Sequence, residues 1–207
     1  IAAQCVALTA MGIILWWAVG YSLVFGKSFS GSALGSIFGG SEHFGFAGLG
    51  ADPSNYEPRI SSGTFALFQA MFAAITPALI IGAVAERMKF SAVILFSALW
   101  TILVYYPIAH AVWGQTGDFA GIANPDSTYK AADFAGGIVV HMTSGWSALL
   151  LCIMVGPRNG YGKRAISPHS MVICVLGNQF FTEEGESAHQ FLGYAACVLV
   201  VIRIVWG

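Results

Sequence analysis

Residues 65–114 read FALFQAMFAAITPALIIGAVAERMKFSAVILFSALWTILVYYPIAHAVWG. Two apolar runs account for most of this stretch, Thr64–Ala85 and Phe90–Trp113, and a short charged turn that holds Arg87 and Lys89 separates them. Each run reaches the roughly 20 residues that a helix needs to cross the hydrocarbon core of a bilayer. The stretch therefore predicts two transmembrane helices joined by a tight turn.

The same pattern occurs on both sides of this pair of helices. Ile1–Gly26 contains no charged residue, and Phe134–Gly156 contains His141 as its one ionisable side chain. Of the 207 residues, 57% are hydrophobic and 9% are charged, far below the roughly 25% charged residues of soluble domains. We expect an all-α, polytopic transmembrane bundle with four full spans. After Gly156 the apolar runs are shorter and predict one or two further helices.

Charge and cysteine content exclude several classes of protein. The net charge of −1 predicts no nucleic-acid partner. The four cysteines form no CxxC pair, so we predict no structural metal site. The expected surroundings are the lipid bilayer of the cell (inner) membrane, and we expect no enzymatic activity.

The distribution of charge between loops predicts the orientation. Lysine and arginine accumulate on the cytoplasmic side of membrane proteins, and here they follow the second and fourth spans. The opposite loops, 27–63 and 114–133, hold more carboxylates than cations and are expected to face outward, as suits a vestibule that attracts cations. The residues that mark the inner side are Arg87, Lys89, Arg158, Lys163 and Arg164.

A histidine in the fourth span indicates a polar function inside the bundle. Gly137, His141 and Gly145 are four residues apart and would share one helix face. Glycine allows a neighbouring backbone to approach closely, so His141 is expected inside a helix bundle. A buried imidazole is costly unless it is hydrogen-bonded or lines a path. His141 is therefore either a core histidine satisfied by a neighbouring backbone or a station on a conduction path.

Other chemically informative residues lie at the outer ends of the spans. Asp133 opens the fourth span, where a carboxylate caps a helix and complements its dipole. Phe68 and Phe72 are one turn apart with Gln69 between them, a pattern that is most often core packing. Trp113 is either a membrane anchor or an open indole face that attracts a small cation, worth up to about 2 kcal/mol when desolvated.

Three strings in this part of the chain also carry a resemblance. AERMKFSA, PIAHAVWG and DFAGGIVVH, which begin at residues 85, 107 and 133, resemble the ammonium transporter (Amt/Rhesus) family from its second to its fifth transmembrane helix. The resemblance covers residues 1–170, which we expect to form an incomplete ammonium transporter region. It implies a homotrimer with one pore through each subunit and ammonium or ammonia as the substrate.

The resemblance also implies roles for individual residues. Phe72 falls on the outer phenylalanine gate, with Phe68 beside it in the substrate site, and Trp113 falls on the aromatic wall of the external ammonium site. Asp133 falls on the buried acidic residue below that site, and His141 on the first of two pore histidines. Ammonium can lose a proton for roughly 3 kcal/mol at neutral pH, because its pKa is about two units higher. This costs less than carrying an ion through an apolar pore.

The last part of the chain departs from this resemblance. Residues 171–207 lack the family's GWFGFNxGS signature, and their HQFLGY and RIVWG strings resemble a bacterial membrane cytochrome b. In that interpretation His189 would ligate haem, while an interfacial histidine is the alternative; otherwise no cofactor is expected. Two further functions therefore stand beside ammonium transport: a haem-binding electron-transfer subunit, and an ammonium sensor with little conduction.

Overall fold

The computed structural model describes residues 2–35 and 37–157. In this part of the chain four helices are long and apolar enough to cross a membrane: Gln4–Phe25, Ser62–Val84, Phe90–Trp113 and Gly137–Val155. The prediction of an all-α bundle with four spans is confirmed, and the described residues contain no strand beyond two isolated bridges. The expected C-terminal helices and His189 lie outside the described residues.

Three of the four spans contain a π-helical segment in addition to α-helix. The first consists of α1 (Ala2–Leu15), a π-helical segment (Trp16–Gly20) and α2 (Tyr21–Phe25). The second is one continuous helix, α3 (Ser62–Val84). The third consists of α4 (Phe90–Trp100), a π-helical segment (Thr101–Tyr105) and α5 (Tyr106–Trp113), and the fourth of a π-helical segment (Gly137–Met142) and α6 (Thr143–Val155).

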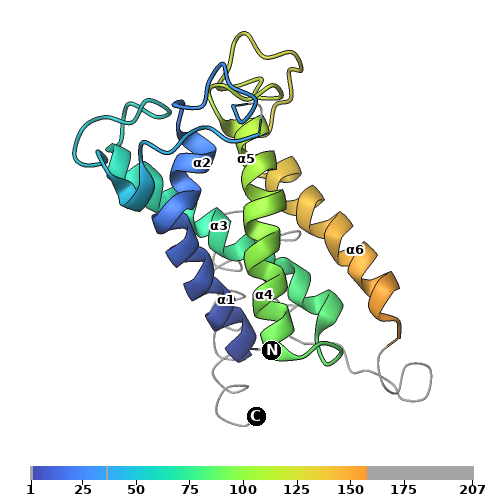
Figure 1. Cartoon of the computed structure of the whole chain (residues 1–207). Coiled ribbons are helices and arrows are strands. Elements are labelled where there is room, and N and C mark those ends of the chain that lie inside the picture. The colour runs from blue at the N-terminus through green and yellow to red at the C-terminus, as the bar shows by residue number, and fades with distance from the viewer. Residues whose placement is uncertain (1, 36, 158–207) are drawn as a thin grey trace, which may run out of the picture. The chain divides into compact units, whose positions relative to one another are not determined.

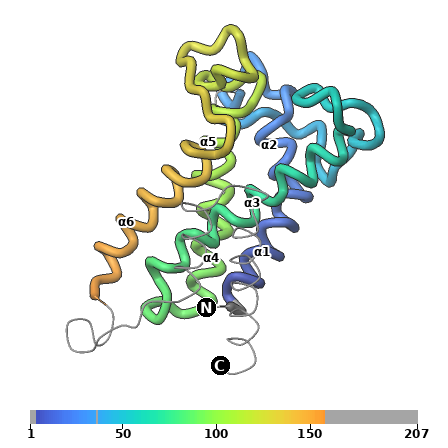
Figure 2. The backbone as a smooth tube through the Cα atoms, turned by 180° about the vertical axis from the view of Figure 1, so that it is seen from behind, coloured from blue at the N-terminus to red at the C-terminus, as the bar shows by residue number. Residues whose placement is uncertain are grey.

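The helix α3 lies between α1 and α6 and contacts both (Figures 1 and 2). A Cβ atom added to Gly12 of α1 would lie 3.0 Å from the Cα atom of Ala74 on α3. Glycine at this position therefore allows the two backbones to touch, which increases the dispersion contact between helices that share an apolar surrounding.

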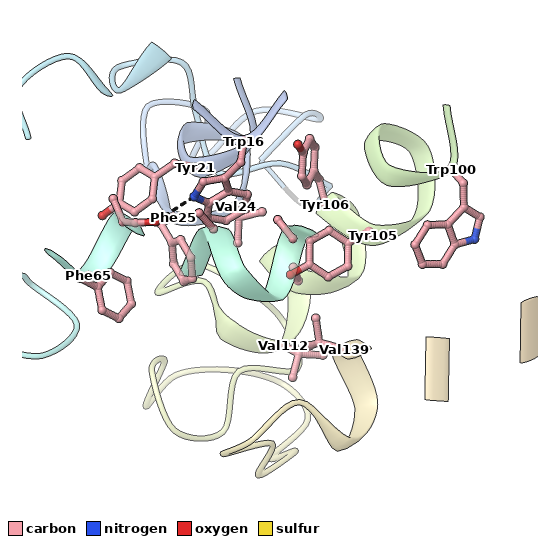
Figure 3. Packing of buried hydrophobic residues seen from close by; sticks show 14 of the residues in the cluster. Trp16, Tyr21, Val24, Phe25, Phe65, Trp100, Tyr105, Tyr106, Val112 and Val139 are labelled. Carbon is pink, nitrogen blue, oxygen red and sulfur yellow. Dashed lines mark hydrogen bonds between the residues drawn. The ribbon is translucent and has the colours of Figure 1, made fainter. Parts of the chain in front are cut away.

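An aromatic cluster fills the bundle between the outer part of the first span (its π-helical segment and α2), α3 and α5. Trp16 packs at 5.9 Å from the ring of Tyr106 and 6.0 Å from that of Phe25. Its indole N–H donates to the carbonyl oxygen of Ala66 at 3.0 Å, which satisfies the polar atom that burial of a tryptophan requires. Figure 3 shows this cluster, in which Tyr106 packs against the ring of Trp16 and Tyr105 packs against Tyr106.

The two long loops lie together at one end of the bundle, and the turn between α3 and α4 lies at the other (Figure 1). At the loop end, Nδ1 of the buried His110 lies 2.9 Å from the carbonyl oxygen of Val24. At the opposite end, Arg87 donates to the carbonyl oxygens of Ala83 and Gly156 and so joins the ends of α3 and α6. The two long loops thus share one side of the bundle, as predicted, and the assignment of that side to the outside stays a prediction.

Candidate cation site at the loop end

A cavity of about 320 Å³ opens at the loop end of the bundle. The outer halves of α3 and α5, the two loops and the residues just before the fourth span form its walls. It brings together the three residues that the sequence predicted for the substrate site, Phe68, Phe72 and Trp113, with Asp133, which was predicted below that site as part of the pore and proton relay with His141. Its full lining comprises Phe25, Asn55, Tyr56, Phe65, Phe68, Gln69, Phe72, Val112, Trp113, Gln115, Ile122, Ala123, Asp133 and Phe134.

Three aromatic rings form one wall of this cavity. The rings of Phe72 and Trp113 meet edge to face, with centroids 5.7 Å apart and an interplanar angle of 70°. Phe68 meets Phe72 in the same way at 5.2 Å, as their separation by one helical turn allows. Phe72 and Trp113 are half-buried, so each has ring surface left for a ligand. The negative face of such a ring attracts a small cation.

Both carboxylate oxygens of Asp133 accept hydrogen bonds from the backbone at the start of the fourth span. Its Oδ1 accepts the backbone N–H groups of Gly136 and Gly137 at 2.7 and 2.8 Å, and its Oδ2 accepts those of Ile138 and Val139 at 2.9 Å each. The residue is 6% exposed. The predicted capping role is therefore confirmed. The cap neutralises the positive end of a helix dipole that would otherwise repel a cation in the cavity.

A glycine with a left-handed backbone makes this cap possible. Gly136 has φ of +87°, a conformation that side chains other than glycine rarely adopt. A Cβ atom there would also lie 2.8 Å from Cγ2 of Val140. The chain thus turns sharply at Gly136 and directs successive N–H groups at one carboxylate.

Trp113 is connected directly to this cap. Its indole Nε1–H donates to the backbone carbonyl oxygen of Asp133 at 2.8 Å. The edge of the indole is therefore used inside the protein, and the ring plane is held in place. This arrangement leaves the faces of the ring, rather than its polar edge, for contact with a ligand.

His141 does not share this cavity. It is exposed and lines a shallow hollow of about 260 Å³ with Met142, Gly145, Trp146 and Leu149. A Cβ atom at Gly145 would meet no atom within 4 Å, so none of the described helices packs on this face. The expectation that His141 is buried in a bundle is therefore not met among residues 2–35 and 37–157, because α6 contacts α3 through other residues.

The loop residues around the cavity carry a negative field. Burial alone would raise the pKa of Glu42. Hydrogen bonds from the Ser28 hydroxyl and from the backbone N–H groups of Lys27 and Ser28 together outweigh this effect, so the pKa lies below its usual range. Hydrogen bonds from Arg59 lower the pKa of the half-buried Glu57 to about 2. Both carboxylates are ionised at neutral pH, but Glu57 is paired with Arg59 at 2.7 Å, so Glu42 is the one of the two whose charge favours cations at the loop end.

Several residues of the cavity were missed by the sequence reasoning. Tyr56 donates its hydroxyl to the carbonyl oxygen of Phe25 at 3.1 Å and accepts the backbone N–H of Gln115, which joins the two loops. Gln115 also donates its side-chain amide to the carbonyl oxygen of Asn55. These contacts join residues about 60 positions apart, so no periodic pattern in the sequence could have indicated them.

The fold and the cavity define an α-helical, multi-pass membrane protein with an aromatic, acid-capped pocket at one membrane face. More specifically, the chain belongs to the ammonium transporter family, because the model described as Ammonium Transporter Family matches residues 1–182. The matches do not support the haem-protein alternative.

Individual relatives agree with this assignment. An ammonium transporter of Bacillus subtilis is 44% identical over 164 residues, which cover 79% of this chain and 37% of that protein. A putative ammonium transporter of Methanothermobacter thermautotrophicus is 46% identical and covers 83% of this chain and 39% of its own length. The crystal structure of Saccharomyces cerevisiae Mep2 superposes with a TM-score of 0.67 at 34% identity, over 84% of this chain. The chain thus spans less than two fifths of these relatives.

Proposed function

We propose that the described helices form the outer half of an ammonium conduction pathway, and that the cavity recruits the ammonium ion. The single observation that supports this best is the edge-to-face pair of Phe72 and Trp113 at 5.7 Å inside an acid-capped cavity. We infer that the cation is ammonium because the chain belongs to the ammonium transporter family.

Recruitment uses the faces of the aromatic rings. A cation that leaves water loses hydration, and ring faces replace part of that loss, worth up to about 2 kcal/mol in a desolvated site. The hydrogen bond from Trp113 to the backbone of Asp133 holds the indole plane in place, so the ring needs no reorganisation when the cation arrives. The ionised carboxylate of Glu42 raises the local concentration of cations.

Conduction beyond the cavity requires a change of species. We infer that the ring of Phe72, which packs edge to face on Trp113, restricts entry to small guests. Deprotonation of ammonium costs roughly 3 kcal/mol at neutral pH, whereas an unpaired ion in apolar surroundings costs far more. We infer that ammonia continues inward and that His141, eight residues after Asp133, accepts its hydrogen bond or relays the proton.

The assembly and location follow the family. We infer a homotrimer in the cell membrane, with each subunit carrying its own path and with no cofactor. The loop end faces outward in this proposal, and the turn that holds Arg87 and Lys89 faces the cytoplasm, as the distribution of lysine and arginine indicates.

Fluorine NMR of the intact chain in nanodiscs tests recruitment. The six tryptophans are labelled as 5-fluorotryptophan, and the Trp113 signal is identified by its loss in Trp113→Phe. We expect ammonium chloride to shift the Trp113 signal saturably, whereas sodium chloride at equal ionic strength leaves it unchanged. A Trp113 signal that responds equally to both salts contradicts the proposed function.

A further inference from the structure

We propose that Gln69 is a specificity-determining residue of the cavity, and that its Oε1 accepts a hydrogen bond from an N–H group of the bound cation. The proposal rests on the proposed function, because it concerns the same cavity. It assigns to one side chain the distinction between cations that carry N–H groups and cations that do not.

The position of Gln69 places it against the aromatic wall. It lies on α3 between Phe68 and Phe72, and its side chain lines the cavity together with Trp113. Residues three apart on a helix lie on neighbouring parts of one face, so Gln69 and Phe72 face the same space. A cation held against the rings of Phe72 and Trp113 is thus bounded by Gln69 as well.

The oxygen of Gln69 is buried without a hydrogen-bond partner among the described residues. Buried polar atoms nearly always have a partner, and each exception calls for a physical explanation. Three other described atoms share this property, Arg87 Nε and the hydroxyls of Tyr105 and Tyr106, but none of these residues lines the cavity. Of these four atoms, the oxygen of Gln69 is the one that belongs to a residue lining the cavity.

Several other polar groups around the ligand space are already used within the protein. The indole N–H of Trp113 donates to the backbone of Asp133, and both carboxylate oxygens of Asp133 accept backbone N–H groups. The Tyr56 hydroxyl donates to Phe25 and accepts from Gln115. An ammonium ion, which has four N–H donors, would find in Gln69 a side-chain acceptor beside the aromatic wall that no described group occupies.

The aromatic rings and the amide oxygen of Gln69 would select different properties of a cation. Aromatic faces attract any cation that fits, through the ring quadrupole. An amide oxygen selects N–H donors, and a hydrogen bond that involves a charged group is about twice as strong as a neutral one. Gln69 would therefore favour ammonium and methylammonium over tetramethylammonium, which has no N–H group.

The experiment compares the affinities of two probes, methylammonium and tetramethylammonium, in the fluorine-labelled chain. The test variant is Gln69→Met, which keeps the length of the side chain and removes the acceptor. We expect methylammonium to bind at least about tenfold more weakly, as the loss of a hydrogen bond to a charged group implies. Tetramethylammonium affinity should change less than about twofold, because its contacts with the rings are the same.

Two further variants separate hydrogen bonding from packing. Gln4→Met replaces a glutamine on α1 that does not line the cavity, and it should leave the ratio of the two affinities unchanged. Gln69→Glu keeps an acceptor at the same position, and it should bind methylammonium at least as tightly as the wild type does. Retention of this binding in Gln69→Glu would also show that the α3 position tolerates substitution.

Three results would overturn the inference. Equal weakening of both probes in Gln69→Met would show a packing role, and an unchanged affinity ratio would show no role in selection. A wild-type Trp113 signal that responds to neither probe would contradict the proposed function and this inference together. A response to both probes with an unchanged ratio in Gln69→Met contradicts this inference alone.

Discussion

Asp133 carries the densest set of hydrogen bonds among the residues of the cavity. Four backbone N–H groups converge on its two oxygens, and its carbonyl oxygen accepts from Trp113. The sequence indicated the cap from the position of the carboxylate at the start of an apolar run. It could not indicate the bond from Trp113, because that contact joins residues 20 positions apart through the turn at Gly136.

Replacement of Asp133 should weaken both the helix start and the cavity. Asp133→Asn replaces one acceptor oxygen with an N–H₂ donor that faces two backbone N–H groups, so we expect a loss of about 2 kcal/mol, within the usual range for a broken buried hydrogen bond. The midpoint of thermal unfolding, followed by tryptophan fluorescence, measures this. Asp126→Asn on the exposed loop is the control and should leave the midpoint unchanged. Equal midpoints for the two variants would contradict the capping role.

The lowered pKa of Glu42 predicts that the stability of the protein depends on pH in the acidic range. This pKa is lower in the folded protein than the ordinary value of 4.5, so the contribution of Glu42 to stability is present above that value and is lost as the pH falls through the lower folded pKa. The wild type should therefore be more stable than Glu42→Gln at pH 7, and the difference should shrink below about pH 4.5. Thermal unfolding of both proteins between pH 7 and pH 3.5 measures it. A difference that is constant with pH would contradict the prediction.

The bounds of the helices were predicted from the sequence more completely than the contacts of the cavity were. The predicted span Phe90–Trp113 has the same bounds in the structure, and the other three differ by at most three residues at either end. Hydropathy determines where a span crosses the bilayer, so a single sequence is sufficient for that. The π-helical segments at Trp16–Gly20 and Thr101–Tyr105 could not be predicted, because they depend on how aromatic side chains pack between helices.

The close packing at Gly20 allows a test of the first π-helical segment. A Cβ atom at Gly20 would lie 2.5 Å from Cζ of Tyr106 and 2.8 Å from Cε3 of Trp16, so the rings would have to move. We expect Gly20→Ala to destabilise the protein by about 1–3 kcal/mol, as overpacking of a core does.

Gly145→Ala is the matched control for this substitution. Its Cβ atom would meet nothing within 4 Å, and alanine favours the helix over glycine by about 1 kcal/mol. Gly145→Ala should therefore leave the unfolding midpoint unchanged or raise it. A midpoint for Gly20→Ala as high as that for Gly145→Ala would show that α2 can shift away from Tyr106 without cost.

For the whole molecule, the structure separates two features that the sequence placed on one path. Phe72 and Trp113 share a cavity, while His141 lines an exposed hollow on α6. The glycine spacing around His141 predicted a face on which a neighbouring helix packs closely, and no described helix packs there. The spacing could not predict which element packs on that face, because the residue pattern of one helix does not identify its packing partner. Among the described residues the face is open.

This separation predicts slow transport by the 207-residue chain when it is reconstituted alone. Ammonia that leaves the cavity needs hydrogen-bond partners along a dry path, and each unsatisfied polar group there costs about 1–3 kcal/mol. The described residues present His141 on an open face instead of an enclosed path. Recruitment should therefore be retained while conduction is limited.

Proteoliposomes that contain a pH-sensitive dye measure the rate after a pulse of ammonium. The Bacillus subtilis ammonium transporter, reconstituted at the same molar density, is the reference, and liposomes without protein give the background permeation of ammonia. We expect the 207-residue chain to be at least about tenfold slower than the Bacillus protein, because even one unsatisfied polar group slows passage by roughly that factor. Saturable transport at a rate close to that of the Bacillus protein, abolished by Trp113→Leu, would show that His141 lies on an enclosed path in the membrane.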